Sequence, residues 1–259
     1  MNNFRLMEIF DRPGYAKLAL RKASAFREAK PFPHIMFDNF LSPDIVDAVA
    51  RSYPDPTADM GWTKHSNLNA KRMFLGDETK VNPWFRQFMQ ATASRQFLLF
   101  LETLSGIKGL IPDPYYIGGG AMVAGRGDYL NMHCDFNWHY KLHCHRRLNA
   151  LFYLTPDWKE EWGGDLRLEP ANADDVTSLG SGVGYSPLFN RVIIFEVSDT
   201  AWHGQPEPMT CPEGAWRRVF SAFYYTSWST KEEQAPHLTV YKQTTPYTEK
   251  PIIEYQGDM

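Results

Sequence analysis

The stretch Tyr129-Leu-Asn-Met-His133-Cys-Asp135 is a short β-rich run that ends in a histidine and a carboxylate two residues apart. Side chains two apart on an extended strand leave the same face, so His133 and Asp135 can act together. A third candidate ligand, His203, follows another β-rich run at residues 192–197 and a short turn. Two imidazoles and one carboxylate on one face of an octahedral metal leave positions open, which suits non-haem Fe(II) that activates oxygen. The pattern predicts a metal site where two strand ends meet at the mouth of a barrel.

Short β-rich runs separated by Gly, Pro and Asn follow from residue 115 onward, a pattern typical of an antiparallel sandwich or barrel. The runs are residues 120–124, 128–133, 148–154, 165–169, 191–197 and 217–226. Strands that follow an α-rich first half predict an α+β chain with a mainly β core, and a jelly roll closes such strands as a double sheet. We expect one domain, made of a helix-rich support region (1–114), a β core (115–228) and a C-terminal arm with a final strand (229–259).

The support region has two helix starts of the same kind, a capping residue followed by proline. Ser42-Pro43 begins one helix, and Asn82-Pro83 begins a long one that can break near Ser94. For residues 1–30 the sequence predicts one or two helices on the outside of the core. A loosely ordered leader is almost equally expected. Residues 32–38 predict a short strand ahead of the first capped helix.

The composition sets limits on the class of protein. Its 259 residues are 43% hydrophobic and 15% aromatic, which is ample for a sizeable core. The net charge of -3 gives no argument for a nucleic-acid or anionic membrane partner. Three cysteines without a CxxC pair argue against a disulfide framework. Neither a signal-peptide pattern nor an apolar run of ~20 residues is present, so we expect a cytoplasmic protein that contacts no membrane.

The strand expected at residues 217–226 carries an arginine that needs a partner. Alternation places Arg217 and Ser221 on one face of the strand and Arg218 on the other. An arginine facing a β core needs a carboxylate, because a buried unpaired charge is costly. The neighbouring predicted strands offer no obvious acid, whereas the carboxylate of a bound ligand could pair with the guanidinium bidentately.

Taken in order, these motifs resemble those of a known family. The resemblance is carried by Tyr129-x-x-x-His133-x-Asp135, Tyr153-Leu-Thr-Pro-Asp-Trp158, Gly163-Gly164-Asp-Leu-Arg-Leu, Phe195-Glu-Val-Ser, His203 and Arg217. This order resembles the prolyl-hydroxylase-like 2-oxoglutarate/Fe(II) dioxygenases, and within them the eukaryotic ribosomal-protein prolyl hydroxylases. The resemblance spans residues 31–228 and is specific only over 120–225. It implies a double-stranded β-helix (jelly-roll) core and an oxidoreductase that uses Fe(II), 2-oxoglutarate and O2.

The resemblance also implies roles for single residues. His133, Asp135 and His203 would be the iron ligands and the catalytic centre. Arg217 would pair with the distal carboxylate of 2-oxoglutarate, and Tyr153 would donate a hydrogen bond to it. Decarboxylation of 2-oxoglutarate to succinate would accompany hydroxylation of an unactivated C–H bond in an amino acid, a peptidyl residue such as proline, or another small metabolite. Halogenating relatives carry a small residue in place of the carboxylate, so Asp135 implies hydroxylation.

The co-substrate site leaves one alternative open. Tyr129 and Ser221 are expected to join it. The gap between the second histidine and the arginine is longer than is usual in the family, because of an insertion at residues 206–213. This leaves Arg218 as a substitute for Arg217. We prefer Arg217, since it leaves Ser221 on the side that faces the site.

The substrate pocket is expected to draw on one strand and one loop. Asn149 shares a strand face with the expected co-substrate tyrosine and should line the pocket. Residues 136–146 are expected to form a loop over its mouth, where Trp138 and His139 either touch the substrate or cover the core. Arg146 or Arg147 either pairs with an acidic group of the substrate or is solvated. The primary substrate would be a small molecule or a peptide.

Two further loops are expected to choose the substrate, residues 55–80 and 171–187, and neither carries a recognisable motif. Within the first loop, Lys64, Lys71 and Arg72 are expected to be ordinary surface charges rather than substrate contacts.

Two other functions use the same fold: a cupin-like metalloenzyme without 2-oxoglutarate, and a metal- or sugar-binding jelly roll without catalysis. Arg217 and Tyr153 would be an odd pair to bury without a keto acid. A separate metal cluster would need side chains whose spacings fit no zinc pattern, namely Cys134, His139, His143, Cys144 and His145.

Overall fold

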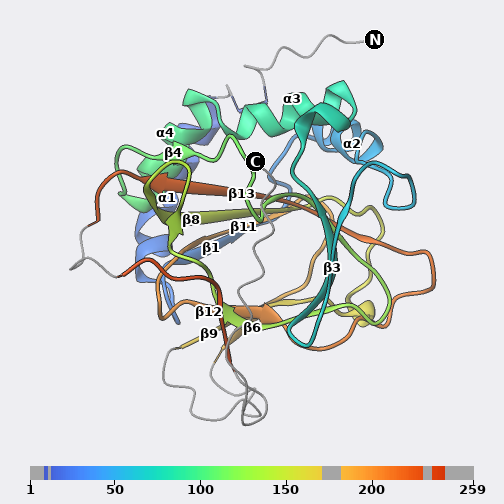
Figure 1. Cartoon of the computed structure of the whole chain (residues 1–259). Coiled ribbons are helices and arrows are strands. Elements are labelled where there is room, and N and C mark those ends of the chain that lie inside the picture. The colour runs from blue at the N-terminus through green and yellow to red at the C-terminus, as the bar shows by residue number, and fades with distance from the viewer. Residues whose placement is uncertain (1–8, 11–12, 171–181, 230–234, 243–259) are drawn as a thin grey trace.

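The computed structural model describes residues 9–10, 13–170, 182–229 and 235–242. Its core is an antiparallel sheet that bends round on itself, with the helices gathered outside one wall (Figure 1). The helices are α1 (Pro13–Glu28), α2 (Pro43–Arg51), η2 (Glu78–Lys80), α3 (Pro83–Thr92), α4 (Arg95–Ser105) and η3 (Glu160–Trp162). The strands are β1 (His34–Phe37), β2 (Thr63–Ser66), β3 (Ala70–Leu75), β4 (Ile111–Pro112), β5 (Gly120–Ala124), β6 (Tyr129–Cys134), β7 (Trp138–His139), β8 (Cys144–Tyr153), β9 (Leu166–Glu169), β10 (Val183–Tyr185), β11 (Arg191–Glu196), β12 (Trp202–Gln205), β13 (Arg217–Thr226) and β14 (Val240–Tyr241).

The strands form two walls joined at one edge. Hydrogen bonding runs in the order β1-β11-β8-β13-β5-β3-β6-β12-β9-β10. The first five strands make the wall beneath the helices, and the last four make the opposite wall, visible at the bottom of Figure 1. β3 pairs with both β5 and β6 and so connects the walls. This is the predicted mainly β, jelly-roll-like core with helical support.

Alternation along the central strands separates a helix-facing side from a cavity-facing side. On β8, Ala150 and Phe152 pack into the cluster formed with the helices, whereas Asn149 and Tyr153 line an internal cavity. Successive strand residues point to opposite faces, so one strand can build the core and the site at once. The position of Phe152 among helix residues such as Phe97 confirms that the helices support this wall.

The capped helices form where the sequence predicts them. Asn82 caps α3 through its side chain, which accepts a hydrogen bond from the amide of Trp84 at 2.9 Å. The long helix is indeed broken, because Ser94 caps α4 and accepts from the amide of Phe97. Ser42 occupies the cap position of α2 but makes no side-chain cap bond. In the described parts of the chain, no helix combines the length and apolar character needed to cross a membrane.

The expectation of loops at 55–80 and 136–146 is partly wrong. The first segment contains the β2–β3 hairpin, which is closed by Asn67, whose side chain accepts from the amides of Asn69 and Ala70. The second contains β7 and the beginning of β8. Most of the third expected loop, residues 171–181, lies outside the described residues, and the rest includes β10.

Candidate metal centre and co-substrate pocket

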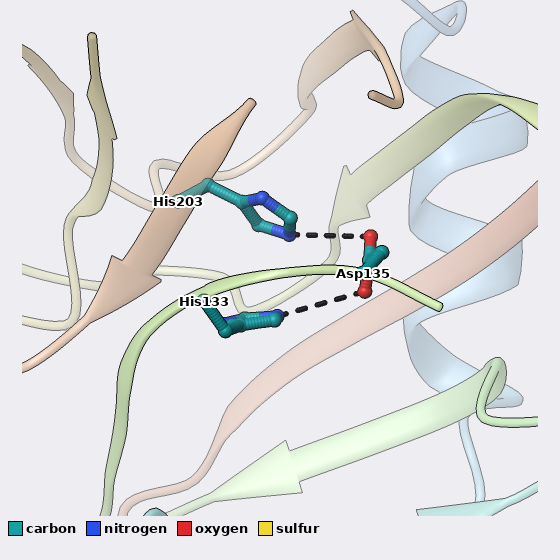
Figure 2. Close-up of side chains that lie close together, drawn as sticks. All are labelled: His133, Asp135 and His203. Carbon is teal, nitrogen blue, oxygen red and sulfur yellow. Dashed lines mark ion pairs between the residues drawn. The ribbon is translucent and has the colours of Figure 1, made fainter. Parts of the chain in front are cut away.

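Two histidines and a carboxylate converge between the walls. His133 lies near the end of β6 and pairs in the ladder with His203 of β12, while Asp135 follows β6 directly. One carboxylate oxygen of Asp135 lies 3.6 Å from Nε2 of His133, and the other lies 3.3 Å from Nε2 of His203. Figure 2 shows both rings directed at this carboxylate. One ligand atom from each residue lies within 4.8 Å of the others, and little of any of the three side chains is exposed.

Backbone carbonyls orient both imidazoles. Nδ1 of His133 lies 2.9 Å from the carbonyl of Asn131, and Nδ1 of His203 lies 2.9 Å from the carbonyl of Ala201. A proton on Nδ1 donates to each carbonyl and leaves the Nε2 lone pair free for a metal. Burial, and to a smaller extent the neighbouring His203, lower the pKa of His133 to about 4. A neutral imidazole is the form that binds a metal.

A buried guanidinium and an amide hold the carboxylate. Asp135 accepts from Nδ2 of Asn149 at 2.7 Å and pairs with Nη2 of Arg146 at 3.0 Å. Arg146 also donates to the amide oxygen of Asn149 from Nε and Nη2, at 3.0 and 2.8 Å. Its guanidinium carbon lies 3.5 Å from the ring centre of Phe223 and 4.4 Å from that of Phe136. Of the two alternatives for Arg146, solvation is therefore wrong, and its Nη2 pairs with the carboxylate of the triad rather than being left for an acidic substrate group.

This network keeps Asp135 ionised. Burial by itself would raise the pKa of the Asp135 carboxyl, but the Arg146 guanidinium and then His203 bring it well below its ordinary value. An anionic carboxylate together with the Nε2 atoms of two imidazoles is the donor set that a divalent transition metal requires.

The triad opens onto a cavity of about 700 Å³ between the two walls. Arg217 and Tyr153 line it as predicted. Arg217 donates from Nη1 to the carbonyl of Gly164 at 2.7 Å, but its buried Nε has no hydrogen-bond partner among the described residues. The buried hydroxyl of Tyr153 has none in that part of the chain either. Two unsatisfied donors that line the same cavity are what a ligand carboxylate would pair with.

Protonation favours this role for the pair. Burial raises the pKa of Tyr153 to about 12 although the charge of Arg217 opposes the shift, so the phenol remains a donor. Ser221 lines the cavity from the same strand face as Arg217. Arg218 faces the helices instead, with its guanidinium carbon 5.8 Å from the ring centre of Tyr53. The geometry thus favours Arg217 over Arg218.

The expectation that Tyr129 lies in the co-substrate site is wrong. Its hydroxyl donates at 3.1 Å to a backbone carbonyl in the turn between β2 and β3, outside the cavity. His133 pairs with His203, but Leu130 pairs with Gln205, so β6 holds one extra residue between the two pairs. This bulge reverses the alternation, which lets Leu130 and His133 both face the cavity while Tyr129 faces away.

The residues expected over the pocket mouth have mixed roles. Trp138 and His139 both line the cavity. His139 is almost fully buried, and its ring nitrogens contact the carboxylate of Asp113 at 3.2 Å and the amide of Leu142 at 3.0 Å. These contacts hold the turn between β7 and β8 in place. Over the described residues, the triad is the one group of three or more His, Cys, Asp or Glu side chains that could hold a metal. The alternative His/Cys cluster does not form.

Arg72 and Tyr241 are among the cavity residues that the sequence did not indicate. Arg72, expected on the surface, lines the cavity from β3. Tyr241 lines it from the C-terminal arm, where β14 pairs with β6, and its ring centre lies 5.5 Å from that of His133. Lys242 fastens this arm through an ion pair with Glu169 at 2.9 Å. The turn residues Asn67 and Asn69 ahead of Met73-Phe-Leu75 could have indicated β3, but no signal pointed to the tyrosine.

Comparison with known proteins agrees with this geometry. Residues 119–226 match the family model described as the 2OG-Fe(II) oxygenase superfamily. This segment is a 2-oxoglutarate/Fe(II) oxygenase domain. The match confirms the expected use of Fe(II), 2-oxoglutarate and O2, and it leaves the two alternative jelly-roll functions without support. No curated protein matches the oxygenase in sequence.

Solved structures share the oxygenase fold. A prolyl hydroxylase from Trichoplax adhaerens, in complex with a peptide of hypoxia inducible factor, is 18% identical over 82% of this chain and 90% of its own, with a TM-score of 0.56. A Pseudomonas putida prolyl-4-hydroxylase is 15% identical over 80% of this chain and 98% of its own, also at 0.56. HygX from Streptomyces hygroscopicus, with nickel, 2-oxoglutarate and hygromycin B bound, is 12% identical over 81% and 89%, at 0.50. These likenesses confirm the double-stranded β-helix.

Proposed function

We propose that this oxygenase uses His133, Asp135 and His203 to hold Fe(II) and hydroxylates an unactivated C–H bond. The convergence of the three ligand atoms within 4.8 Å, beside a cavity, is the observation that carries the proposal. Three protein ligands on one side of an octahedral metal leave positions for a co-substrate and for oxygen. When bound, Fe(II) and 2-oxoglutarate together activate O2 and supply the oxidising power for the reaction.

The chain's own residues bind and orient the reactants. The unsatisfied donors of Arg217 and Tyr153 would hold the distal carboxylate of 2-oxoglutarate, with Ser221 beside them. Arg146 and Asn149 fix the orientation of the carboxylate ligand through three hydrogen bonds and an ion pair. Apolar side chains between these groups exclude water, which strengthens the electrostatic interactions in the site. The residues that do so include Leu151, Leu166, Phe195 and Val219.

The proposed substrate is an amino acid, a peptidyl residue such as proline, or another small metabolite. The similar prolyl hydroxylase from Trichoplax adhaerens is in complex with a peptide, and HygX binds a small molecule, hygromycin B. A cavity of about 700 Å³ is within the usual range for small-ligand sites and can hold 2-oxoglutarate together with either kind of group. The net charge of -3 gives no argument for a nucleic-acid partner, and the remaining part of the proposal is a cytoplasmic location.

Succinate formation tests the proposed function. The protein, loaded with Fe(II) and 2-oxoglutarate under anaerobic conditions and then exposed to O2, should produce succinate, and one member of an amino-acid and peptide panel should raise the rate. His133→Ala should reduce succinate formation at least about 100-fold, because loss of one of three ligands releases the metal.

His143→Ala is the matched control, since the exposed His143 lies outside the cavity and should leave the rate unchanged. Equal rates for wild type and His133→Ala, or no succinate from wild type with any panel member, would contradict the assignment.

A further inference from the structure

Three arginines are among the described residues that line the cavity, and Arg72 is the one for which the proposed reaction gives no role. It lies on β3 and shares a strand face with Phe74, and both line the cavity. Its Nε is buried and has no hydrogen-bond partner in the described parts of the chain. Burial lowers the pKa of the guanidinium, but an arginine in a protein remains charged. A buried, charged donor without a partner is costly unless a ligand supplies one.

The surroundings of Arg72 contain no spare acid. Within the described residues, no carboxylate lies within ion-pair distance of its guanidinium. Asp135 is the only carboxylate among the described residues that line the cavity, and Arg146 and the two histidines already contact it. Among the other groups that interact with Arg72 electrostatically, Tyr241 has a hydroxyl, and Arg146 and Arg217 are themselves positive.

The charges that line the cavity favour the binding of a further anion. Three arginines and one carboxylate line it, namely Arg72, Arg146, Arg217 and Asp135. Asp135 offsets Arg146, and the two negative charges of 2-oxoglutarate would offset Fe(II). The loaded cavity therefore retains excess positive charge, which a further anion would reduce.

We propose that Arg72 binds a carboxylate of the primary substrate. The inference rests on the proposed function and names the substrate class for the same site: an amino acid or peptide with a free carboxylate. Arg217 and Tyr153 already provide a paired site for the distal carboxylate of 2-oxoglutarate. Arg72 interacts electrostatically both with Arg217 and with Asp135, one of the proposed iron ligands, so a substrate anchored on it would present a C–H bond close to the metal.

Binding to the loaded but unreacted enzyme tests the proposal. The wild-type protein, anaerobic with Fe(II) and saturating 2-oxoglutarate, is titrated by calorimetry with three sets of compounds, each with its primary amide as partner. The sets are free amino acids, peptides with a C-terminal carboxylate, and peptides with an acidic side chain. At least one carboxylate should bind about 10- to 100-fold more tightly than its amide, because a charge-assisted pair is lost in the amide.

Variants assign this preference to one side chain. Arg72→Gln should remove the preference, and Arg72→Lys should keep part of it. Lys71→Gln removes a charge from the neighbouring position of β3, where the lysine is half-exposed and pairs with Asp128, so it should leave the preference intact. The set that contains the tightest-binding carboxylate shows whether the substrate carboxylate belongs to a free amino acid, to a peptide C-terminus or to an acidic side chain.

Other outcomes overturn the proposal. If no carboxylate binds more tightly than its amide, or if the preference survives in Arg72→Gln, the arginine does not anchor the substrate. If Arg72→Gln weakens 2-oxoglutarate binding as strongly as it weakens the panel, the residue belongs to the co-substrate site. A separate titration of wild type with 2-oxoglutarate shows whether the proposed function itself fails, which keeps the two failures distinct.

Discussion

Arg217→Met is expected to weaken 2-oxoglutarate binding about 100-fold, because a charge-assisted pair is worth up to about 3 kcal/mol. The guanidinium is buried, and its Nε faces a cavity in which no described residue satisfies it. Methionine keeps a similar length and fills the same apolar surroundings without the charge. The dissociation constant of 2-oxoglutarate, measured anaerobically in the metal-loaded protein, reports the effect without requiring turnover.

Arg218→Met is the matched control for this prediction. Arg218 is the next residue on β13, yet it faces the ring of Tyr53 on the helix side. Its replacement should change the 2-oxoglutarate dissociation constant less than about threefold. A large loss in Arg218→Met together with a small loss in Arg217→Met would reverse the assignment, and equal losses in both would indicate a general structural effect.

Arg146→Met is expected to lower the affinity for the metal by about 10- to 100-fold, the usual effect of removing a group that orients a metal ligand. The guanidinium contacts both Asp135 and Asn149 and packs against two phenylalanine rings. Without it, the carboxylate loses a buried partner and its amide contact loses support. Competition with a metal chelator measures the affinity, and methionine still packs against the two rings.

Arg147→Met provides the comparison. Arg147 follows directly on β8 but points the other way, donating to the hydroxyl of Thr226 and lying 5.2 Å from the ring centre of Trp228. Metal affinity should be unchanged in this variant. If both replacements lower the affinity equally, Arg146 acts only through the stability of the wall.

Features that depend only on residues close together in the sequence were predictable. Alternation on one strand places Arg217 and Ser221 together, and a capping serine predicts the helix break at Ser94. These follow from the two-residue period of a strand and from the chemistry of a cap. The HxD spacing likewise predicts that His133 and Asp135 act together, and the structure brings them together.

Features that depend on register or on distant segments were not predictable in this way. Tyr129 is turned out of the site by one extra residue in β6, a bulge that strict alternation does not reveal. Arg72 faces the cavity because β3 joins the two walls, which the pattern of its own hairpin does not indicate. Arg146 and Asp135 are eleven positions apart, and only tertiary folding makes them an ion pair. Tyr241 reaches the cavity because an arm returns to pair with β6.

Metal stoichiometry tests the central claim most directly. The anaerobic protein should bind one Fe(II) per chain, and 2-oxoglutarate should bind only after the metal. Single replacements of His133, Asp135 and His203 by alanine should each abolish tight binding, whereas His143→Ala should retain one equivalent. Full metal binding by any of the three triad variants, or its loss in the control alone, would contradict the proposed centre.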